Sequence, residues 1–185
     1  MGGLRFGTFM EKFAVKRGLI KQIGAGGLSQ LGAKYFDDIT ANAEGGFTAE
    51  KGILSRVQAD YDGDGNLVVE VVQMRGDDLN EFLSAEGGRE AAMASRAAWS
   101  SFLDEATGYS PKQRGDKAKE NAKKISKSKS AIKMANKFME MSSNVSTETR
   151  AQAEELMVEI QAKLDEGNAT RAMSLSDKLT KLVES

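Results

Sequence analysis

The sequence predicts an α+β protein, in which a small N-terminal domain with a β-hairpin packed by helices precedes a basic helix and a C-terminal antiparallel helical hairpin. Strand-like alternation is concentrated in residues 53–74, whereas almost every later segment has helical spacing. A length of 185 residues suits one domain of ordinary size, or a small domain with a helical appendage. We therefore expect three parts: an α+β domain over residues 4–108, a basic amphipathic helix or linker over 111–141, and a helical hairpin over 146–185.

The first fifty residues predict one strand and one or two short helices. Phe9, Phe13 and Val15 belong to the expected first strand. Apolar residues then recur at roughly helical spacing from Leu19 to Ile39, and the glycine-rich residues 24–27 interrupt them. We expect one or two helices with a glycine break.

A β-hairpin is the clearest local prediction. Residues 53–60 alternate between two faces, and residues 67–72 are rich in β-branched side chains. The Asp-Gly pairs at 62–65 favour the turn between them. The segment also starts like an EF-hand calcium loop, but its twelfth position, which needs a bidentate Glu, is Val71. We expect a turn, and a weak metal site at Asp60–Asp64 stays open as the alternative.

Helices are expected from Asp77 onward. Asp77 is placed at the N-cap of a short helix that ends at Gly87-Gly88. The next helix spans about 89–107, where Gly108 suits its C-terminal end, and Pro111 suits the first turn of the helix after it. The core face expected for helix 89–107 comprises Ala92, Met93, Ala97, Trp99, Phe102 and Leu103.

Residues 147–184 predict two antiparallel helices with a break at Gly167-Asn168. Several of the nine methionines lie between Met134 and Met157. We expect these to fill gaps in a helical core, and an adaptable binding surface is the alternative. The apolar stripe of the two helices comprises Ala153, Leu156, Met157, Ile160, Leu164, Ala172, Leu175, Leu179 and Leu182.

The composition excludes several kinds of active site. The chain contains neither His nor Cys. A Ser-His-Asp triad, a Cys nucleophile, the usual zinc ligand sets, iron–sulfur clusters and disulfides are therefore excluded. No pair of carboxylates stands out as an acid/base dyad, so we expect a non-enzymatic protein without a cofactor. Because no apolar run reaches the ~18–20 residues of a membrane span, we expect a cytoplasmic protein with no membrane partner.

The net charge of −1 hides an uneven distribution. Between Lys112 and Lys137 lie ten basic and two acidic residues, a net charge of +8 against −9 for the rest of the chain. At about 100° per residue, six of these lysines share one side of a helix, opposite an apolar side. Such a row binds nucleic acid through phosphates without reading sequence. The residues expected to contact nucleic acid are Lys112, Arg114, Lys119, Lys123, Lys127, Lys133 and Lys137.

Two segments carry a family resemblance. They are Phe13–Gly18 and Trp99–Arg114, the second of which contains the run Ala-Thr-Gly-Tyr before a basic stretch. Over residues 13–125 the chain resembles a small archaeal family of unassigned function. The resemblance implies an α+β domain that ends in a basic tail, and it implies no activity and no site residues.

The leading hypothesis is a non-enzymatic binding module that contacts nucleic acid or a ribonucleoprotein through its lysine-rich helix, with the C-terminal hairpin as a protein contact. The main alternative is a protein–protein scaffold or oligomerisation protein whose basic segment meets an acidic partner. A basic amphipathic helix also fits an anionic membrane surface, and a merely solvated helix face is a further alternative.

Overall fold

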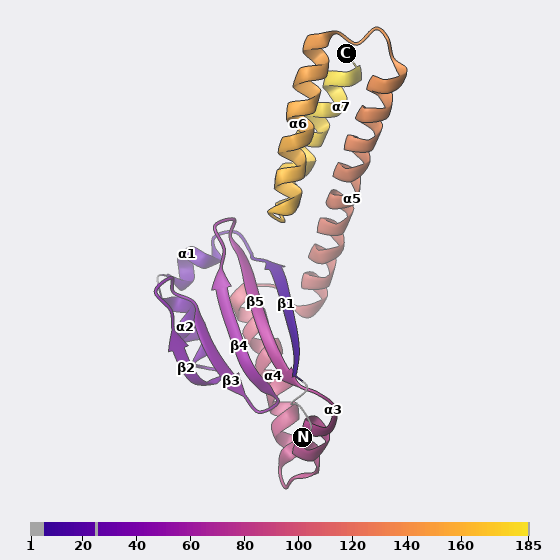
Figure 1. Cartoon of the computed structure of the whole chain (residues 1–185). Helices are drawn as coiled ribbons and strands as arrows, with labels where there is room; N and C mark the ends of the chain where they lie inside the picture. Colours follow the sequence, from indigo (N-terminus) through magenta and orange to yellow (C-terminus); the bar gives the residue numbers. More distant parts are fainter. Residues whose placement is uncertain (1–5, 25, 185) are drawn as a thin grey trace. The chain divides into compact units, whose positions relative to one another are not determined.

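The structure is a computed structural model that describes residues 6–24 and 26–184. The predicted domain start at Leu4 and Ala25 of the predicted glycine break lie outside the described residues. The chain divides into two compact units at Gly115/Asp116. A five-stranded antiparallel sheet in the first unit and helices after it confirm the predicted α+β fold (Figure 1).

The sheet of the first unit has the strand order β1-β5-β4-β3-β2, and every neighbouring pair is antiparallel. The predicted hairpin is confirmed, since β4 pairs with β5 from Tyr61↔Leu67 outward. The predicted first strand is also present and lies at one edge, next to β5. The strands are β1 (Phe6–Ala14), β2 (Asp37–Ala41), β3 (Phe47–Lys51), β4 (Leu54–Tyr61) and β5 (Asn66–Met74).

Two of these strands, β2 and β3, were not predicted from the sequence. Ile39, assigned to a helical pattern, lies in β2. In β3, Phe47 and Ala49 are buried, and the strand pairs with β4 along one side and with β2 along the other. Pairing with strands elsewhere in the chain gives these short segments their conformation, which their own periodicity does not reveal.

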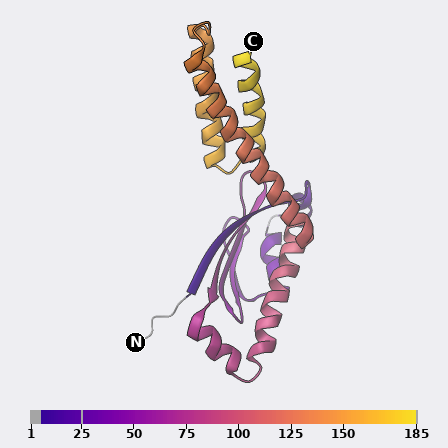
Figure 2. The same ribbon diagram turned by 90° about the vertical axis from the view of Figure 1, so that its right-hand side faces the viewer.

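The helices of the first unit are α1 (Leu19–Ile23), α2 (Gly27–Gly32), α3 (Gly76–Ser84) and α4 (Gly88–Thr107). Figure 2 shows α4 running along one face of the sheet. Of the one or two helices expected around the glycine break, the structure has two, α1 and α2. The prediction for α3 needs one correction, because its N-cap is Arg75 and Asp77 lies in the first turn, where its carboxylate still suits the positive helix end.

The core of the first unit lies between the sheet and α4. Its centre is a group of rings, in which Phe102 lies 5.2 Å from Phe36 and 5.5 Å from Phe47 between centroids. Trp99 contacts the same group as expected, at 6.1 Å from Phe102. Two residues predicted for the core of α4 are wrong, since Met93 is 71% exposed and Ala97 is also exposed.

The second unit contains most of α5 (Pro111–Met141) together with α6 (Thr147–Asp165) and α7 (Ala169–Glu184). Residues 111–141 form one continuous helix. The helical hairpin is formed by α6 and α7, and Ser146 caps α6 by accepting a hydrogen bond from the Thr149 N–H. The shared core of the three helices comprises Ala135, Met139, Ala153, Ile160, Ala172, Leu175 and Leu179.

Candidate nucleic-acid interface

The sequence Ser110-Pro111-Lys112-Gln113 explains where α5 begins. The Gln113 N–H donates to Ser110 Oγ, and the Ser110 N–H donates to Gln113 Oε1. This reciprocal pair is a capping box, and Pro111 occupies the first helical position, where its missing N–H costs nothing. The helix that presents the basic stretch therefore has a defined N-terminus.

Five of the predicted lysines form one exposed surface on α5 within the second unit. We call this surface the lysine ridge. All five are exposed, and the buried side of the helix is instead formed by Ser128, Ala135 and Met139. From first to last the ridge extends about 27 Å along the helix at about 1.5 Å per residue. The lysine ridge comprises Lys119, Lys123, Lys127, Lys133 and Lys137.

The remaining two predicted residues lie in the first unit. Lys112 is exposed in the first turn of α5. Arg114 is different, because its side chain is only 9% exposed and forms an ion pair with Asp104. Its guanidinium also donates to the Tyr109 carbonyl oxygen at 2.6 Å. The structure thus places Arg114 in the joint between α4 and α5 rather than on an exposed basic surface.

Glu120 lies within the basic stretch and forms ion pairs with two lysines of the same helix. Its carboxylate lies 3.0 Å from Lys117 Nζ and 2.9 Å from Lys124 Nζ. Hydrogen bonds from Lys124 and Lys117 lower the pKa of Glu120 to about 2. Lys124 also donates to Thr170 Oγ1 of α7 at 3.2 Å. These pairs engage two lysines outside the ridge, and no ion pair or hydrogen bond engages the five ridge lysines among the residues described.

Three large apolar side chains are exposed beside the ridge. Met134 is 72% exposed, Phe138 43% and Met141 77%. They are separated by four and three residues, so they are neighbours on the helix surface. We call them the apolar patch. The expectation that the methionines fill a core holds for Met139, which is buried, but not for Met134 and Met141. On a helical projection of the sequence, Phe138 falls on the same side as the ridge lysines, and this position is the signal that would have revealed the patch.

A groove between α5 and α7 adjoins both surfaces. Its volume is about 250 Å³. On the α5 side it reaches Lys127 of the ridge and Met134 of the apolar patch, and on the α7 side it reaches Met173 and Asp177. The hydroxyl-bearing residues along it are Ser126, Ser130, Ser176 and Thr180. The second unit therefore combines positive charge, exposed apolar surface and hydrogen-bonding groups in one region.

In the EF-hand-like segment, the carboxylate of Asp62 is hydrogen-bonded within the turn itself. Asp62 Oδ1 accepts hydrogen bonds from the N–H groups of Asp64 and Asn66, and Oδ2 lies 2.7 Å from Lys12 Nζ of β1. Burial raises the pKa of Asp62, but the bonds from Lys12 and Asn66 outweigh it, so the pKa lies below its ordinary value of 3.8. Within the described residues no three acidic side chains cluster as a metal site would require. The turn and the ion pair account for this carboxylate.

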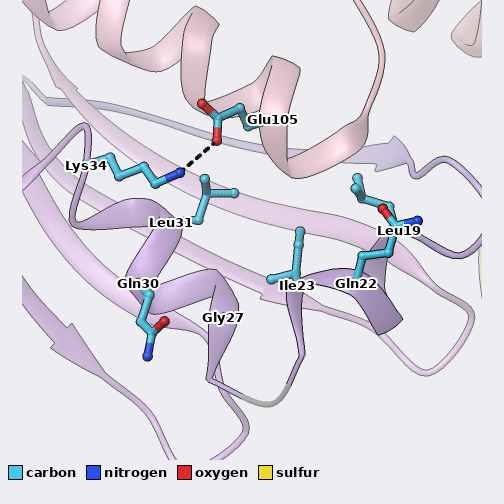
Figure 3. Close-up of a pocket in the computed structure, with 8 residues that line it drawn as sticks. All are labelled: Leu19, Gln22, Ile23, Gly27, Gln30, Leu31, Lys34 and Glu105. Atoms are coloured by element: carbon cyan, nitrogen blue, oxygen red, sulfur yellow. Dashed lines mark hydrogen bonds and ion pairs between the residues drawn. The ribbon is translucent and has the colours of Figure 1, made fainter.

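The first unit has an open pocket of about 440 Å³ between α4 and the segment from α1 to Lys34. In Figure 3, Leu31 and Ile23 point toward α4, whereas Gln30 points away. Glu105 lies 3.2 Å from Lys34 Nζ and also accepts a hydrogen bond from Tyr35 Oη. This bond to Glu105 raises the pKa of Tyr35 to about 12 and lowers the pKa of Glu105. Lys34 and Glu105 neutralise each other here, so the pocket presents apolar surface and, among the residues described, no unpaired charged group that could act as a catalyst.

A known protein family covers most of the first unit and the start of α5. Over residues 10–120 the chain matches the family described as Domain of unknown function (DUF5611), and it belongs to this family. The match confirms the resemblance to a conserved family of unassigned function inferred from Phe13–Gly18 and Trp99–Arg114, while the archaeal origin stays a prediction. No curated protein and no solved structure matches the chain. Among the helices described, none is both long and apolar enough to cross a membrane.

Proposed function

We propose that the protein is a non-enzymatic binding module that contacts nucleic acid or a ribonucleoprotein through the lysine ridge. The observation that carries the proposal is the exposure of five lysines on one side of α5, together with the absence of an ion-pair partner for any of them in the described chain. The ion pairs described within α5 join Glu120 to Lys117 and Lys124, which lie outside the ridge. The ridge therefore keeps its positive charge for a ligand.

The spacing of the ridge favours a polyanion over a single small anion. Lys119, Lys123 and Lys127 follow one another at intervals of four residues, about 6 Å along the helix axis. These intervals are shorter than the Debye length of about 8 Å at physiological ionic strength, so the fields of neighbouring lysines reinforce one another. A nucleic acid meets such a row with regularly spaced phosphates and releases condensed counterions on binding.

Salt dependence and charge reversal test the proposal together. Fluorescence anisotropy of a labelled oligonucleotide mixed with the full chain gives affinity at several salt concentrations. With five lysines engaged, log K should fall against log[salt] with a slope of about −3.5 on a single strand and about −4.5 on a duplex. Replacing Lys119, Lys123, Lys127 and Lys133 by glutamate should abolish binding.

A matched pair of double variants provides the control. Lys119→Glu with Lys127→Glu reverses two charges on the ridge, whereas Arg89→Glu with Arg96→Glu reverses two exposed charges on α4. The first variant should lose most of the affinity and much of the salt slope, and the second should retain both. Equal loss in the two variants would show that only total charge matters, and the ridge would then have no specific role.

A protein scaffold is the competing proposal, and one observation favours it. Val158 on α6 is 72% exposed, and Glu154, Glu155 and Glu159 are exposed near it. This acidic face with an apolar centre is suited to a basic partner surface, including α5 of a second copy. Light scattering should then show concentration-dependent self-association that Val158→Asp removes. Leu179 is unsuitable for this test because it is fully buried.

A further inference from the structure

The apolar patch lies on the same side of α5 as the ridge. Six large hydrophobic side chains are prominently exposed in the described chain, and Met134, Phe138 and Met141 are three of them. Within α5, Met134 and Met141 follow Lys127 at successive intervals of seven residues, so these three side chains share one line along the helix. A purely solvated lysine face gives no reason to expose this apolar surface, which indicates a ligand with apolar as well as anionic parts.

The groove beside the patch has a different polarity from the ridge. Met134 and Met173 supply soft apolar surface, while Ser126, Ser130 and Thr180 place hydroxyl-bearing side chains along it. Asp177 also lines the groove, and its carboxylate repels a phosphate. The same carboxylate accepts hydrogen bonds from amino groups, which the bases of a nucleic acid carry on their edges. The region thus places an anion-binding row directly beside a surface that suits bases.

From this adjacency we infer that the nucleic acid bound by α5 is single-stranded, with its phosphates on the lysine ridge and its bases against the apolar patch and the α5–α7 groove. The inference rests on the proposed function, because it requires that the ridge binds nucleic acid. In a duplex the faces of the bases are stacked on one another and unavailable to Phe138. In a single strand they are free to stack on an aromatic ring while the backbone follows a basic row.

The experiment compares a single-stranded oligothymidylate with a hairpin duplex of equal nucleotide count, both labelled for anisotropy and mixed with the full chain. The wild-type protein should bind the single strand at least about tenfold more tightly. Phe138→Ala should weaken single-strand binding about tenfold, within the range expected for one stacked base, and should leave the salt slope unchanged. Met93→Ala is the control, since it removes an exposed apolar side chain from α4, where Met93 is 71% exposed.

The outcomes separate this inference from the proposed function. Equal or tighter binding of the duplex, or no effect of Phe138→Ala, would overturn the single-strand inference while the ridge still bound nucleic acid. Binding of neither probe at low salt would overturn the proposed function itself, and the inference with it. Polyglutamate, added as a competitor, should displace the oligothymidylate poorly. Efficient displacement would show that the surface responds to charge alone, as an acidic protein partner requires.

Discussion

Arg114 at the start of α5 forms an ion pair with Asp104 near the end of α4, and its guanidinium also binds the Tyr109 carbonyl between the two helices. The side chain of Arg114 is 9% exposed, whereas that of Asp104 is 44% exposed. One cation therefore fixes the turn that joins the sheet-bearing part of the first unit to α5. A mostly buried guanidinium in this position stabilises the fold and is poorly placed to meet an external phosphate.

Arg114→Ala should consequently lower the free energy of unfolding of the first unit by about 2 kcal/mol, since it removes hydrogen bonds made by a charged, mostly buried group. Trp99 is the only tryptophan and packs, partly buried, against the core of this unit, so its fluorescence during urea unfolding measures the change. Lys112→Ala, at an exposed site two residues away, should leave the midpoint unchanged. If Arg114→Ala leaves stability intact and weakens oligonucleotide binding, the prediction that Arg114 contacts nucleic acid would be right.

The pair between Asp62 and Lys12 makes the stability of the first unit depend on pH. The pKa of Asp62 lies below 3.8 in the folded chain, so the unfolded chain binds the proton more readily. The stabilisation is therefore fully present above the ordinary pKa and is lost as the pH falls through the lowered folded pKa.

Asp62→Asn keeps an oxygen acceptor for the turn, removes the charge and replaces the Oδ2 that faces Lys12 by an amide NH2 group. The variant should be less stable than the wild-type protein by about 1 kcal/mol at pH 7, a value that allows for the partial exposure of the pair. The difference in urea midpoint, followed by Trp99 fluorescence, should shrink as the pH falls below 3.8. Lys12→Gln should reproduce the loss at pH 7. A difference that is the same at pH 7 and at pH 2 would argue against a charge effect.

The parts of the fold that the sequence predicts are those whose signals are local. The hairpin around Asp62–Gly65 combines β-branched strands with turn residues, and α6 and α7 have a continuous apolar stripe. In contrast, β2 contains Asp37, Asp38 and Thr40, and only one of its five residues is even half-buried. Its strand conformation depends on pairing with β3, a partner that periodicity within β2 does not identify.

The candidate site shows the same division. Helical angles correctly place the five ridge lysines on the side opposite Ala135 and Met139. Arg114 was included because it belongs to the basic stretch, although its helical angle differs from that of Lys112 by about 200°. Its acceptors, Asp104 and the Tyr109 carbonyl, come together only through the turn between α4 and α5. Counting charge along the sequence identifies the basic segment, but it does not show which of the basic side chains already form ion pairs within the fold.

The second unit contains a buried hydroxyl that should reduce its stability. Ser128 is fully buried in α5, and no hydrogen-bond partner for its Oγ is present among the described residues. Burying an unpaired hydroxyl is unfavourable, so Ser128→Ala should raise the free energy of unfolding by about 1 kcal/mol. Ser176→Ala provides the matched control, because Ser176 is also buried but donates to the Ala172 carbonyl at 2.8 Å. Thermal unfolding followed by far-UV circular dichroism should show stabilisation by the first change and none by the second.

Glu120 should weaken nucleic-acid binding in the wild-type protein, because it is a fixed negative charge close to the lysine ridge. With its pKa at about 2, it stays ionised from pH 4 to pH 7, so lowering the pH over this range should not relieve the effect. Glu120→Gln should raise affinity about twofold at low salt, since it removes a negative charge that repels phosphates from the helix that bears the ridge. The gain should disappear at high salt, where screening shortens the range of the interaction.

Glu155→Gln is the control for this last variant, because it removes the same charge from an exposed position on α6. Anisotropy titrations with the oligothymidylate at two salt concentrations measure both variants. Glu120→Gln should gain more affinity than Glu155→Gln because the lost charge lies on the helix that bears the ridge. Equal gains would mean that the ligand senses the charge of the whole second unit, and reduced affinity in Glu120→Gln would mean that its pairs with Lys117 and Lys124 order the binding surface.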